Sequence, residues 1–557
     1  MSVPTGMPGS SLMVSGLLLF TVLFCTMTTP SALGDATTAP HELDGASIWS
    51  NATILEQLGA SYPAYRCAGS AGANASADWI LSKFQEIGLE AYKEGFQFHG
   101  WDLASRPFME VAYQNGSSQS NSTLASFQSE HFSVGTTSEG AIGELVLLPL
   151  PSARSYGAFT DLSFNPASWQ GIDVHDRIVL VGREVRWNSE YEEGLADKIQ
   201  EGPAALVFYY SQPWSLPFEV MTSASSGGRP LSGLGSYLYA HDVPTGHLDT
   251  NDSEWLLSAL EEGNISARVL IDAWQGIWTQ HNIVASLPGE SGQSEQVLLT
   301  AHYDSVMDGG FCDNAVSVAA LIEVASVLKS MRDKGTFDPS CTISFIAFTG
   351  EELGLVGSEY YYAMHAIEMD QVKAVVNVDC IGAGAMTRTI TEPSQGLDLD
   401  ELVDEVALEL GISLTIVEGG SDHSSFIFPH DVAWQMQTRW GLSPQIPGAA
   451  TPVISSISLL SEPMTLLESL PSGNPGWIHT SRDSSSYCSS SGWVTEGRLQ
   501  EQGSVVLAVV LELAGTVQVP DDGGNPFPAT AIAMAALAMV AVAVLLVLVL
   551  RPRAPRR

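Results

Sequence analysis

The chain has 557 residues, of which 62 are acidic and 23 are basic, giving a formal net charge of −39. This balance excludes a nucleic-acid-binding protein, because a phosphate-binding surface needs clustered Lys and Arg. Hydrophobic residues make up 45% and charged residues 15% of the chain, which excludes a disordered protein. The length predicts two or three folded units.

The first 34 residues predict a signal peptide. An apolar run over residues 12–27 is followed by small residues, and residues 32–34 fit a cleavage site. No basic residue precedes the run, so an uncleaved anchor helix is the alternative. Export also agrees with six N-x-S/T sequons, the acceptor sites of a glycoprotein, at Asn51, Asn74, Asn115, Asn121, Asn251 and Asn264.

Two stretches follow that differ in pattern. Residues 45–130 mix helix and strand, and apolar residues at helical spacing predict a helix over 75–88 that ends at Gly88. Residues 133–272 instead carry short β-rich runs separated by turn residues, which predicts a β-rich inserted domain. Its predicted strands are 143–149, 177–182, 204–210 and 267–272.

From residue 275 to 515, predicted strands alternate with helices. This alternation indicates an α/β domain in which helices cover both faces of a mixed sheet. The strands are expected at 282–287, 296–301, 342–348 and 374–378, and the helices near 314–332, 353–368 and 500–515. A stretch rich in Pro and Ser at 442–475 predicts a long loop.

The C-terminus predicts a transmembrane helix. Residues 529–550 carry no charge, and as a helix they would span about 33 Å, enough to cross a bilayer. Four arginines lie in residues 551–557, which the positive-inside rule places in the cytoplasm. A glycolipid-anchor signal normally ends in its hydrophobic tail, so these arginines argue against one. The bulk of the chain is then extracellular or lumenal.

Acidic residues and histidines follow the predicted strands of the α/β region, where ligands of such sheets collect. The candidates are His302 in AHYDS, Asp313 in CDNAV, Glu351 and Glu352 in FTGEELGLVGS, Asp379 in VNVDCIG and His479 in WIHTSRD. Two divalent ions that share one carboxylate, with one His and one further carboxylate each, use two His and three acids. One Glu of the adjacent pair is then left to move protons.

The motifs HYDS, DNA, TGEELGLVGS, VNVD, GGSDHSSF and IHTSRD resemble, in this order, those of the co-catalytic zinc aminopeptidases and their glutamate carboxypeptidase relatives. YRCAGSAG at 65–72 is similar to an early part of that family. The resemblance implies a three-layer zinc-exopeptidase domain, of the phosphorylase/hydrolase-like type, over 45–130 and 275–515. Residues 133–272 resemble a protease-associated domain.

The resemblance also implies roles for single residues. Asp313 is expected to bridge two zinc ions, for which Co²⁺ or Mn²⁺ are alternatives. His302 and Asp379 would complete one site and Glu352 and His479 the other. Glu351 would be the general base, and Asp304 would orient His302. Asp422 and His423 would lie near the substrate, and Asp483 would support His479.

The chain departs from the family at three positions. Ile478 stands where many members have the Tyr that polarises the scissile carbonyl, so that partner is not predicted. Cys312 and Cys380 each adjoin a predicted ligand. Their thiols are either buried and inert or placed to tune the metals.

The expected function is therefore a membrane-anchored aminopeptidase that acts on peptides. A carboxypeptidase or dipeptidase on the same site is one alternative, kept open by Arg439 and Arg482, which could bind a carboxylate. An inactive surface receptor is the other, although such relatives lose ligands that this chain keeps. The oligomeric state is left undetermined.

Overall fold

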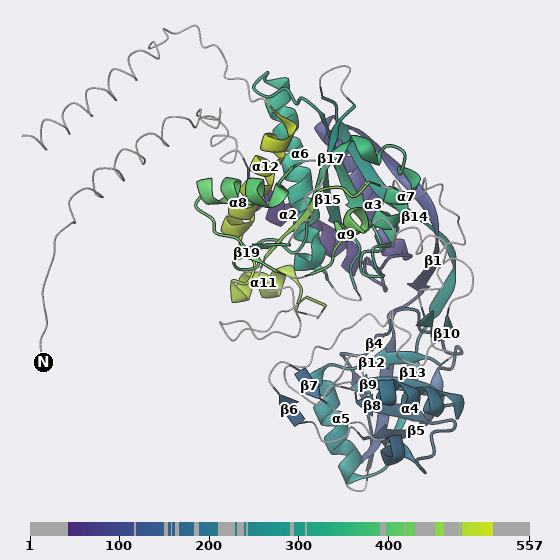
Figure 1. The fold of residues 1–557 in the computed structure, drawn as a ribbon. Coiled ribbons are helices and arrows are strands. Elements are labelled where there is room, and N and C mark those ends of the chain that lie inside the picture. The colour runs from purple at the N-terminus through teal and green to yellow at the C-terminus, as the bar shows by residue number, and fades with distance from the viewer. Residues whose placement is uncertain are drawn as a thin grey trace, which may run out of the picture. The chain divides into compact units, whose positions relative to one another are not determined.

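The fold was examined in a computed structural model of the chain (Figure 1). The structure describes residues 43–115, 118–149, 154–156, 159–161, 166–182, 189–209, 229–230, 239–240, 243–289, 294–306, 309–389, 397–417, 419–428, 452–461, 478–479 and 482–515. The predicted signal peptide, the transmembrane helix at 529–550 and the tail at 551–557 lie outside these residues.

Within the described residues, one helical stretch, Phe311–Asp333, is long and apolar enough to cross a membrane. However, 89% of the most apolar segment of this stretch is buried inside the protein. The stretch is therefore a core helix of the sheet domain.

An eight-stranded mixed sheet forms the centre of the fold, in the order β1-β14-β16-β15-β17-β20-β18-β19. β16, β15, β17 and β20 run parallel to one another, whereas β1 and β14 are antiparallel to their neighbours. The strands are β1 (Glu90–Leu103), β14 (Ala273–Leu287), β15 (Gln296–His302), β16 (Thr342–Phe348), β17 (Val372–Val378), β18 (Met386–Arg388), β19 (Thr415–Ile416) and β20 (Ser456–Ser461).

Helices cover both faces of this sheet, which makes the predicted three layers (Figure 1). On β15, Val297 and Leu299 belong to one apolar core while Leu298, between them, belongs to the other. Strands buried on both faces read as continuous apolar runs, as these do. The first core contains α2 (Gly45–Ala60), α3 (Ala71–Ile87), α6 (Val316–Asp333), α8 (Leu399–Glu409) and α12 (Glu496–Ala514), and the second contains α7 (Val356–Met364) and α9 (Ser424–Ile427).

Local sequence signals set the ends of several helices. The Ser70 side chain accepts a hydrogen bond from the Ala73 N–H at the start of α3, and α3 ends at Gly88, whose φ of 88° needs a glycine. The end of this helix is confirmed at the predicted residue. Shorter helical turns are η4 (Phe311–Ala315), η5 (Met369–Gln371) and α11 (Ser485–Ser491).

The expectation of an uninterrupted loop over 442–475 is wrong at β20, which pairs with β17 in the central sheet. Serines alternate with Ile457 and Leu459 in this strand, and every residue of the strand is buried. Buried Ser458 is satisfied by the amide of Asn377 on the neighbouring strand. The serine content therefore reflects hydrogen bonding inside the sheet and not a solvated loop.

A second eight-stranded sheet lies between β1 and β14 in the chain, in the order β3-β2-β13-β5-β8-β9-β12-β4. Its β2 begins at Phe108, before the predicted boundary at 133, and the four strands predicted in this stretch are present. The strands are β2 (Phe108–Asn115), β3 (Ser118–Leu124), β4 (Gln128–Ser129), β5 (Ala141–Leu148), β8 (Ile178–Gly182), β9 (Ala205–Tyr209), β12 (Thr245–His247) and β13 (Ser266–Leu270).

This second sheet has helices and an apolar cluster of its own, which includes Leu148, Trp169 and Val179. The remaining elements of the stretch are α4 (Ser189–Gln200), α5 (Thr250–Glu262), η2 (Pro166–Trp169), and the strand pairs β6 (Arg154–Tyr156) with β7 (Phe159–Asp161) and β10 (Arg229–Pro230) with β11 (Tyr239–Ala240). The residues 133–272 remain the predicted limits of the inserted domain.

The core around β15 generates a stability prediction. Replacing the fully buried Leu299 with Ala should lower the free energy of unfolding by about 2–5 kcal/mol, because it removes apolar contacts and leaves a cavity. Leu408→Ala on α8, where 69% of the side chain is exposed, is the matched control and should cost less than about 0.5 kcal/mol. Chemical denaturation measures both, and equal losses would contradict the assigned core.

Candidate metal centre

The parallel register of three strands brings the candidate residues to one edge of the sheet. His302 is the last residue of β15 and pairs with Phe348, the last residue of β16. Asp379 directly follows β17, and Glu351 and Glu352 follow β16 by a short turn. Because these strands run in the same direction, their carboxyl ends form a common rim, as the sequence predicts.

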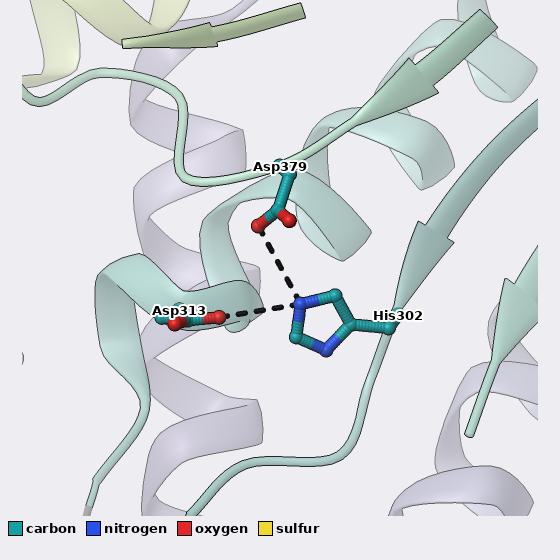
Figure 2. Close-up of side chains that lie close together, drawn as sticks. All are labelled: His302, Asp313 and Asp379. Carbon is teal, nitrogen blue, oxygen red and sulfur yellow. Dashed lines mark ion pairs between the residues drawn. The ribbon is translucent and has the colours of Figure 1, made fainter. Parts of the chain in front are cut away.

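One group at this rim consists of His302, Asp313 and Asp379 (Figure 2). The His302 Nε2 atom lies 3.2 Å from the Asp313 Oδ1 atom and 3.4 Å from the Asp379 Oδ1 atom. All three side chains are buried and converge from β15, from η4 and from the end of β17. One nitrogen and two carboxylate oxygens are ligands that zinc accepts.

A second group consists of Asp313, Glu352 and His479. The His479 Nε2 atom lies 3.1 Å from the Asp313 Oδ2 atom and 2.9 Å from the Glu352 Oε2 atom. Asp313 thus offers one carboxylate oxygen to each group. A carboxylate shared in this way is the arrangement that a pair of metal ions requires.

Charge compensation indicates that these residues fit metal ions. Burial alone would lower the pKa of His302, but Asp379, Asp304 and Asp313 outweigh it and hold that pKa well above its usual range. The pKa of His479 is likewise held well above its usual range, because Glu352 and Asp313 outweigh the effect of its burial. The Asp379 Oδ1 and Glu352 Oε1 atoms are buried without a hydrogen-bond partner among the described residues. Bound cations would satisfy both atoms.

Glu351 is a further carboxyl group that lies close to these two groups. Burial raises its pKa well above the usual range, and the nearby carboxylates Glu352, Asp379 and Asp422 add to the effect. A carboxyl group with a raised pKa can accept and return a proton near neutral pH. The structure therefore brings Glu351 to the rim without including it in either ligand group.

Asp304 contacts both His302 and the turn that carries Glu351 and Glu352. Its Oδ1 atom lies 3.5 Å from the His302 Nδ1 atom, consistent with the predicted orienting contact. The same carboxylate also accepts hydrogen bonds from the backbone N–H groups of Glu351 and Glu352, at 3.3 and 3.4 Å. This second contact, which the motifs do not reveal, ties the turn after β16 to the end of β15.

Arg66, in the YRCAGSAG motif, is a fully buried residue whose part in the site was not predicted. Its guanidinium donates hydrogen bonds to the carbonyl oxygens of Tyr303, Gly309 and Gly310, at 2.9, 2.7 and 2.7 Å. These carbonyls lie in the loop between His302 and Asp313. Arg66 therefore fixes the path of the chain from one ligand to the next.

The Asp483 carboxylate holds the backbone of Asp313. It accepts hydrogen bonds from the Cys312 N–H at 2.6 Å and from the Asp313 N–H at 3.0 Å. Burial and the Asp313 charge raise the pKa of Asp483 to about 7. Asp483 was expected to support His479, whereas these hydrogen bonds hold the backbone of Asp313. The sequence places Asp483 close to His479 but does not show which loop it faces.

A chain of buried polar side chains orients Asp379. The Ser421 hydroxyl donates to the Asp379 Oδ2 atom at 2.7 Å, and the Asn377 amide donates to Ser421 at 2.9 Å. The Asn377 oxygen in turn accepts from Thr300 on β15. Asp379 is left with Oδ1 directed at His302.

Asp422 and His423 follow Ser421 and are both buried. Burial and the charges of Asp304 and Asp379 raise the pKa of Asp422 to about 7. Burial lowers the pKa of His423 to about 4. The charge of Asp379 thus affects the pKa of both residues. Their contact with substrate remains a prediction.

Several residues near the site have unusual backbone conformations. Of the non-glycine residues with positive φ, Leu355, Cys380 and His479 lie in the loops that carry the acidic and imidazole groups, with φ of 63°, 52° and 57°. Such conformations cost roughly 1–3 kcal/mol each and accumulate at functional sites. The peptide bond between Asp313 and Asn314 is cis.

The thiols of Cys312 and Cys380, each next to a candidate ligand, are both buried. Interaction with the Cys380 thiol would lower the pKa of Cys312, but burial and the carboxylates of Asp483, Asp313 and Asp379 raise it to about 11. Ile478, which stands where many members of the resembled family have Tyr, is also buried.

A helix-covered mixed sheet with paired carboxylate and imidazole groups at its carboxyl-end rim defines a class of α/β metallohydrolases. Residues 282–499 match the model of peptidase family M28.

Curated relatives agree with this assignment. The chain is 27% identical over 345 residues to aminopeptidase YwaD of Bacillus subtilis, covering 61% of this chain and 63% of that protein. It is 25% identical over 194 residues to a probable leucine aminopeptidase 2 of Aspergillus oryzae, covering 32% of this chain and 38% of that protein. The chain thus matches less than two thirds of the length of these relatives.

Solved structures share the fold. A zinc aminopeptidase from Bacillus subtilis, BSAP, superimposes with a TM-score of 0.57 at 22% identity, covering 85% of this chain and 96% of that chain. A peptidase M28 precursor from Shewanella amazonensis superimposes with a TM-score of 0.57 at 16% identity, covering 88% and 98%. The α/β mixed-sheet fold predicted from the sequence is confirmed.

Protonation of the two imidazoles leads to a prediction about metal binding. Nearby carboxylates hold the pKa of both imidazoles well above the usual range, so protons compete with zinc for these nitrogens. Zinc binding should therefore release protons, and lowering the pH should weaken it. Calorimetry in buffers of different ionisation enthalpy measures the release. His479→Ala should reduce the number released, and equal numbers for both proteins would contradict this reading.

The contact of Asp483 with Cys312 and Asp313 leads to a second prediction. Asp483→Asn leaves one acceptor oxygen for two backbone N–H groups, so metal affinity should fall by about 10- to 100-fold. Chelator competition measures the affinity, and Asp370→Asn at an exposed position is the control. Unchanged affinity in Asp483→Asn would show that Asp313 does not depend on this support.

Proposed function

We propose that the chain is a zinc-dependent aminopeptidase that removes single residues from the N-terminus of peptides. The observation that carries the proposal is the Asp313 carboxylate, whose two oxygens face two separate groups of potential ligands. His302 and Asp379 would hold one ion, Glu352 and His479 the other, and Asp313 both. The aminopeptidase names of the relatives support this reaction class.

The residues beside the ligands have matching tasks in hydrolysis. When bound, two zinc ions supply a water molecule of lowered pKa and polarise the scissile carbonyl. Glu351 would accept a proton from the attacking water and return it to the leaving amine. Asp304 keeps Glu351 in place through its backbone N–H and keeps His302 oriented through Nδ1. Asp422 and His423 border the substrate.

Charge at the site favours an aminopeptidase over a carboxypeptidase. Several carboxylates lie near Glu351 and would attract the free ammonium group of a substrate. Arg66 donates its hydrogen bonds to backbone carbonyls, and Arg388 is held by Asp400 and Asp404, so both are engaged away from substrate. A carboxypeptidase would depend on Arg482, which lies over the Tyr487 ring, or on Arg439, outside the described residues.

The location follows from the two ends of the chain. We infer that residues 1–34 direct export and that 529–550 anchor the protein, leaving the peptidase outside the cytoplasm. The second sheet would be a protease-associated insert within 133–272. A protease-protection assay on right-side-out membrane vesicles tests the orientation, with one tag inserted after residue 35 and another after residue 557: the tag after residue 557 should be the protected one.

The general base can be tested directly. Glu351→Gln keeps the shape of the side chain but cannot accept a proton, so kcat on an aminoacyl-arylamide should fall by about 10²- to 10⁴-fold while metal content is retained. Glu368→Gln, at an exposed position, is the control and should have wild-type activity. Wild-type activity in Glu351→Gln would refute the assignment.

The same assay separates the peptidase classes. Purified residues 35–520 are offered substrates with a free amine and their N-acetyl counterparts. Cleavage of the free-amine substrates alone supports an aminopeptidase. Release of C-terminal residues from the N-acetyl peptides would instead indicate a carboxypeptidase, and inactivity on both with two bound metal ions would favour a receptor.

A further inference from the structure

The turn between β16 and α7, which carries Glu351, is closed by hydrogen bonds of its own backbone. The Glu351 carbonyl oxygen accepts from the Gly354 N–H at 2.8 Å and from the Leu355 N–H at 3.1 Å. The turn therefore has little internal freedom, and its orientation depends on how its two ends are held. Thr349 lies at one end, directly after β16, and Gly357 lies at the other, in the first turn of α7.

One face of β14 contacts both ends of this turn. β14 lies beside α7 (Figure 1), and the Asn282 side-chain amide donates a hydrogen bond to the Gly357 carbonyl oxygen at 3.0 Å. The Thr349 hydroxyl donates to the Gln280 Oε1 atom at 3.2 Å. Gln280 and Asn282 are alternate residues of the strand, so their side chains leave it on the same face. Both are fully buried.

The Asn282 side chain is itself held in one orientation. Its amide also donates to the Glu94 Oε2 atom at 3.2 Å, and Glu94 lies directly opposite Asn282 in the pair of β1 with β14. The Glu94 Oε1 atom lies 2.7 Å from the Nε2 atom of His365, which follows α7. The carbonyl oxygen and the carboxylate that face the amide both accept hydrogen bonds. A rotation of the amide by 180° would therefore lose both contacts.

The backbone approaches Asn282 too closely for any residue other than glycine at position 357. A Cβ atom added to Gly357 would collide with the Thr349 carbonyl oxygen and with the Asn282 Oδ1 atom. α7 thus begins in direct contact with β14 and with the residue that ends β16. Because protein interiors are close-packed, a change in Asn282 is passed on to the turn instead of being absorbed by a gap.

We propose that Gln280 and Asn282 are positioning residues of the peptidase reaction, which hold the two ends of the turn and so set Glu351 relative to the ligand groups. The proposal rests on the proposed function, in which Glu351 is the general base. Both residues act through the backbone of the turn. A misplacement of about 1 Å that arises far from the reacting atoms can lower a rate about 100-fold.

Asn282→Ala removes the amide that holds the start of α7. In the full-length chain, purified in detergent and saturated with zinc, kcat on an aminoacyl-arylamide should fall by about 10- to 100-fold, while KM changes by less than about threefold. The hydrogen bonds from the turn to Asp304 remain, so the loss should not exceed that of Glu351→Gln. Thr279→Ala, at an exposed position of β14, is the matched control and should keep wild-type kinetics.

A double-mutant cycle separates the positioning of Glu351 from general damage to the protein. If Asn282 acts through Glu351, Asn282→Ala should change kcat by less than about threefold in the Glu351→Gln background, because the effects of residues that act as a unit are not additive. An equal loss of kcat in both backgrounds would show that Asn282 only stabilises the fold, and this result would overturn the proposal.

Thr349 supplies a second test, which does not depend on the folding of the Asn282 variant. Thr349→Val removes the hydroxyl that donates to Gln280 and should lower kcat by about 10-fold, whereas Thr349→Ser keeps the hydroxyl and should stay within about threefold of the wild type. Equal losses in the two variants, or wild-type kcat in both Thr349→Val and Asn282→Ala, would overturn the positioning role alone. A wild-type protein that cleaves no peptide would refute the proposed function and this role with it.

Discussion

The site depends on the concentration of negative charge in a place that water does not solvate. His302, Asp313 and Asp379 are buried, Glu352 and His479 lie half-buried beside them, and Glu351 adds a fourth carboxyl group. The neighbouring carboxylates raise the pKa of His302 and of His479, and burial raises the pKa of Glu351. Burying charge in this way is costly, so the surrounding structure has to fix every one of these groups.

Most of that support acts on the backbone around the ligands. Arg66 holds the loop between His302 and Asp313, and Asp483 holds the backbone at Asp313. Ser421 donates a hydrogen bond to the Asp379 Oδ2 atom. They reach the site from α2–α3, from the segment before α11, and from the turn before α9. The site is thus assembled from the whole sheet domain and from no single motif.

Much of this could be predicted from the sequence, because strands buried on both faces produce apolar runs and each run ends in a polar motif. β15, β16 and β17 are of this kind, and their shared direction brings His302, Glu352 and Asp379 together. β20 was missed because its buried serines are satisfied by hydrogen bonds to other residues of the sheet domain, among them Asn377 and Cys380. The bonds of Arg66 and Asp483 were missed because both join segments far apart in the chain, a relation that local spacing does not encode.

The pairing of β1 with β14 has a consequence for synthesis of the protein. Glu90 pairs with Ser286, so the whole second sheet is made between the two partners. During translation, β1 leaves the ribosome with no neighbour along this edge, and it must wait until the intervening residues have emerged. Contacts this distant in sequence slow folding and leave an exposed strand edge. Independent folding of the second sheet would shorten that delay by bringing β1 and β14 close together.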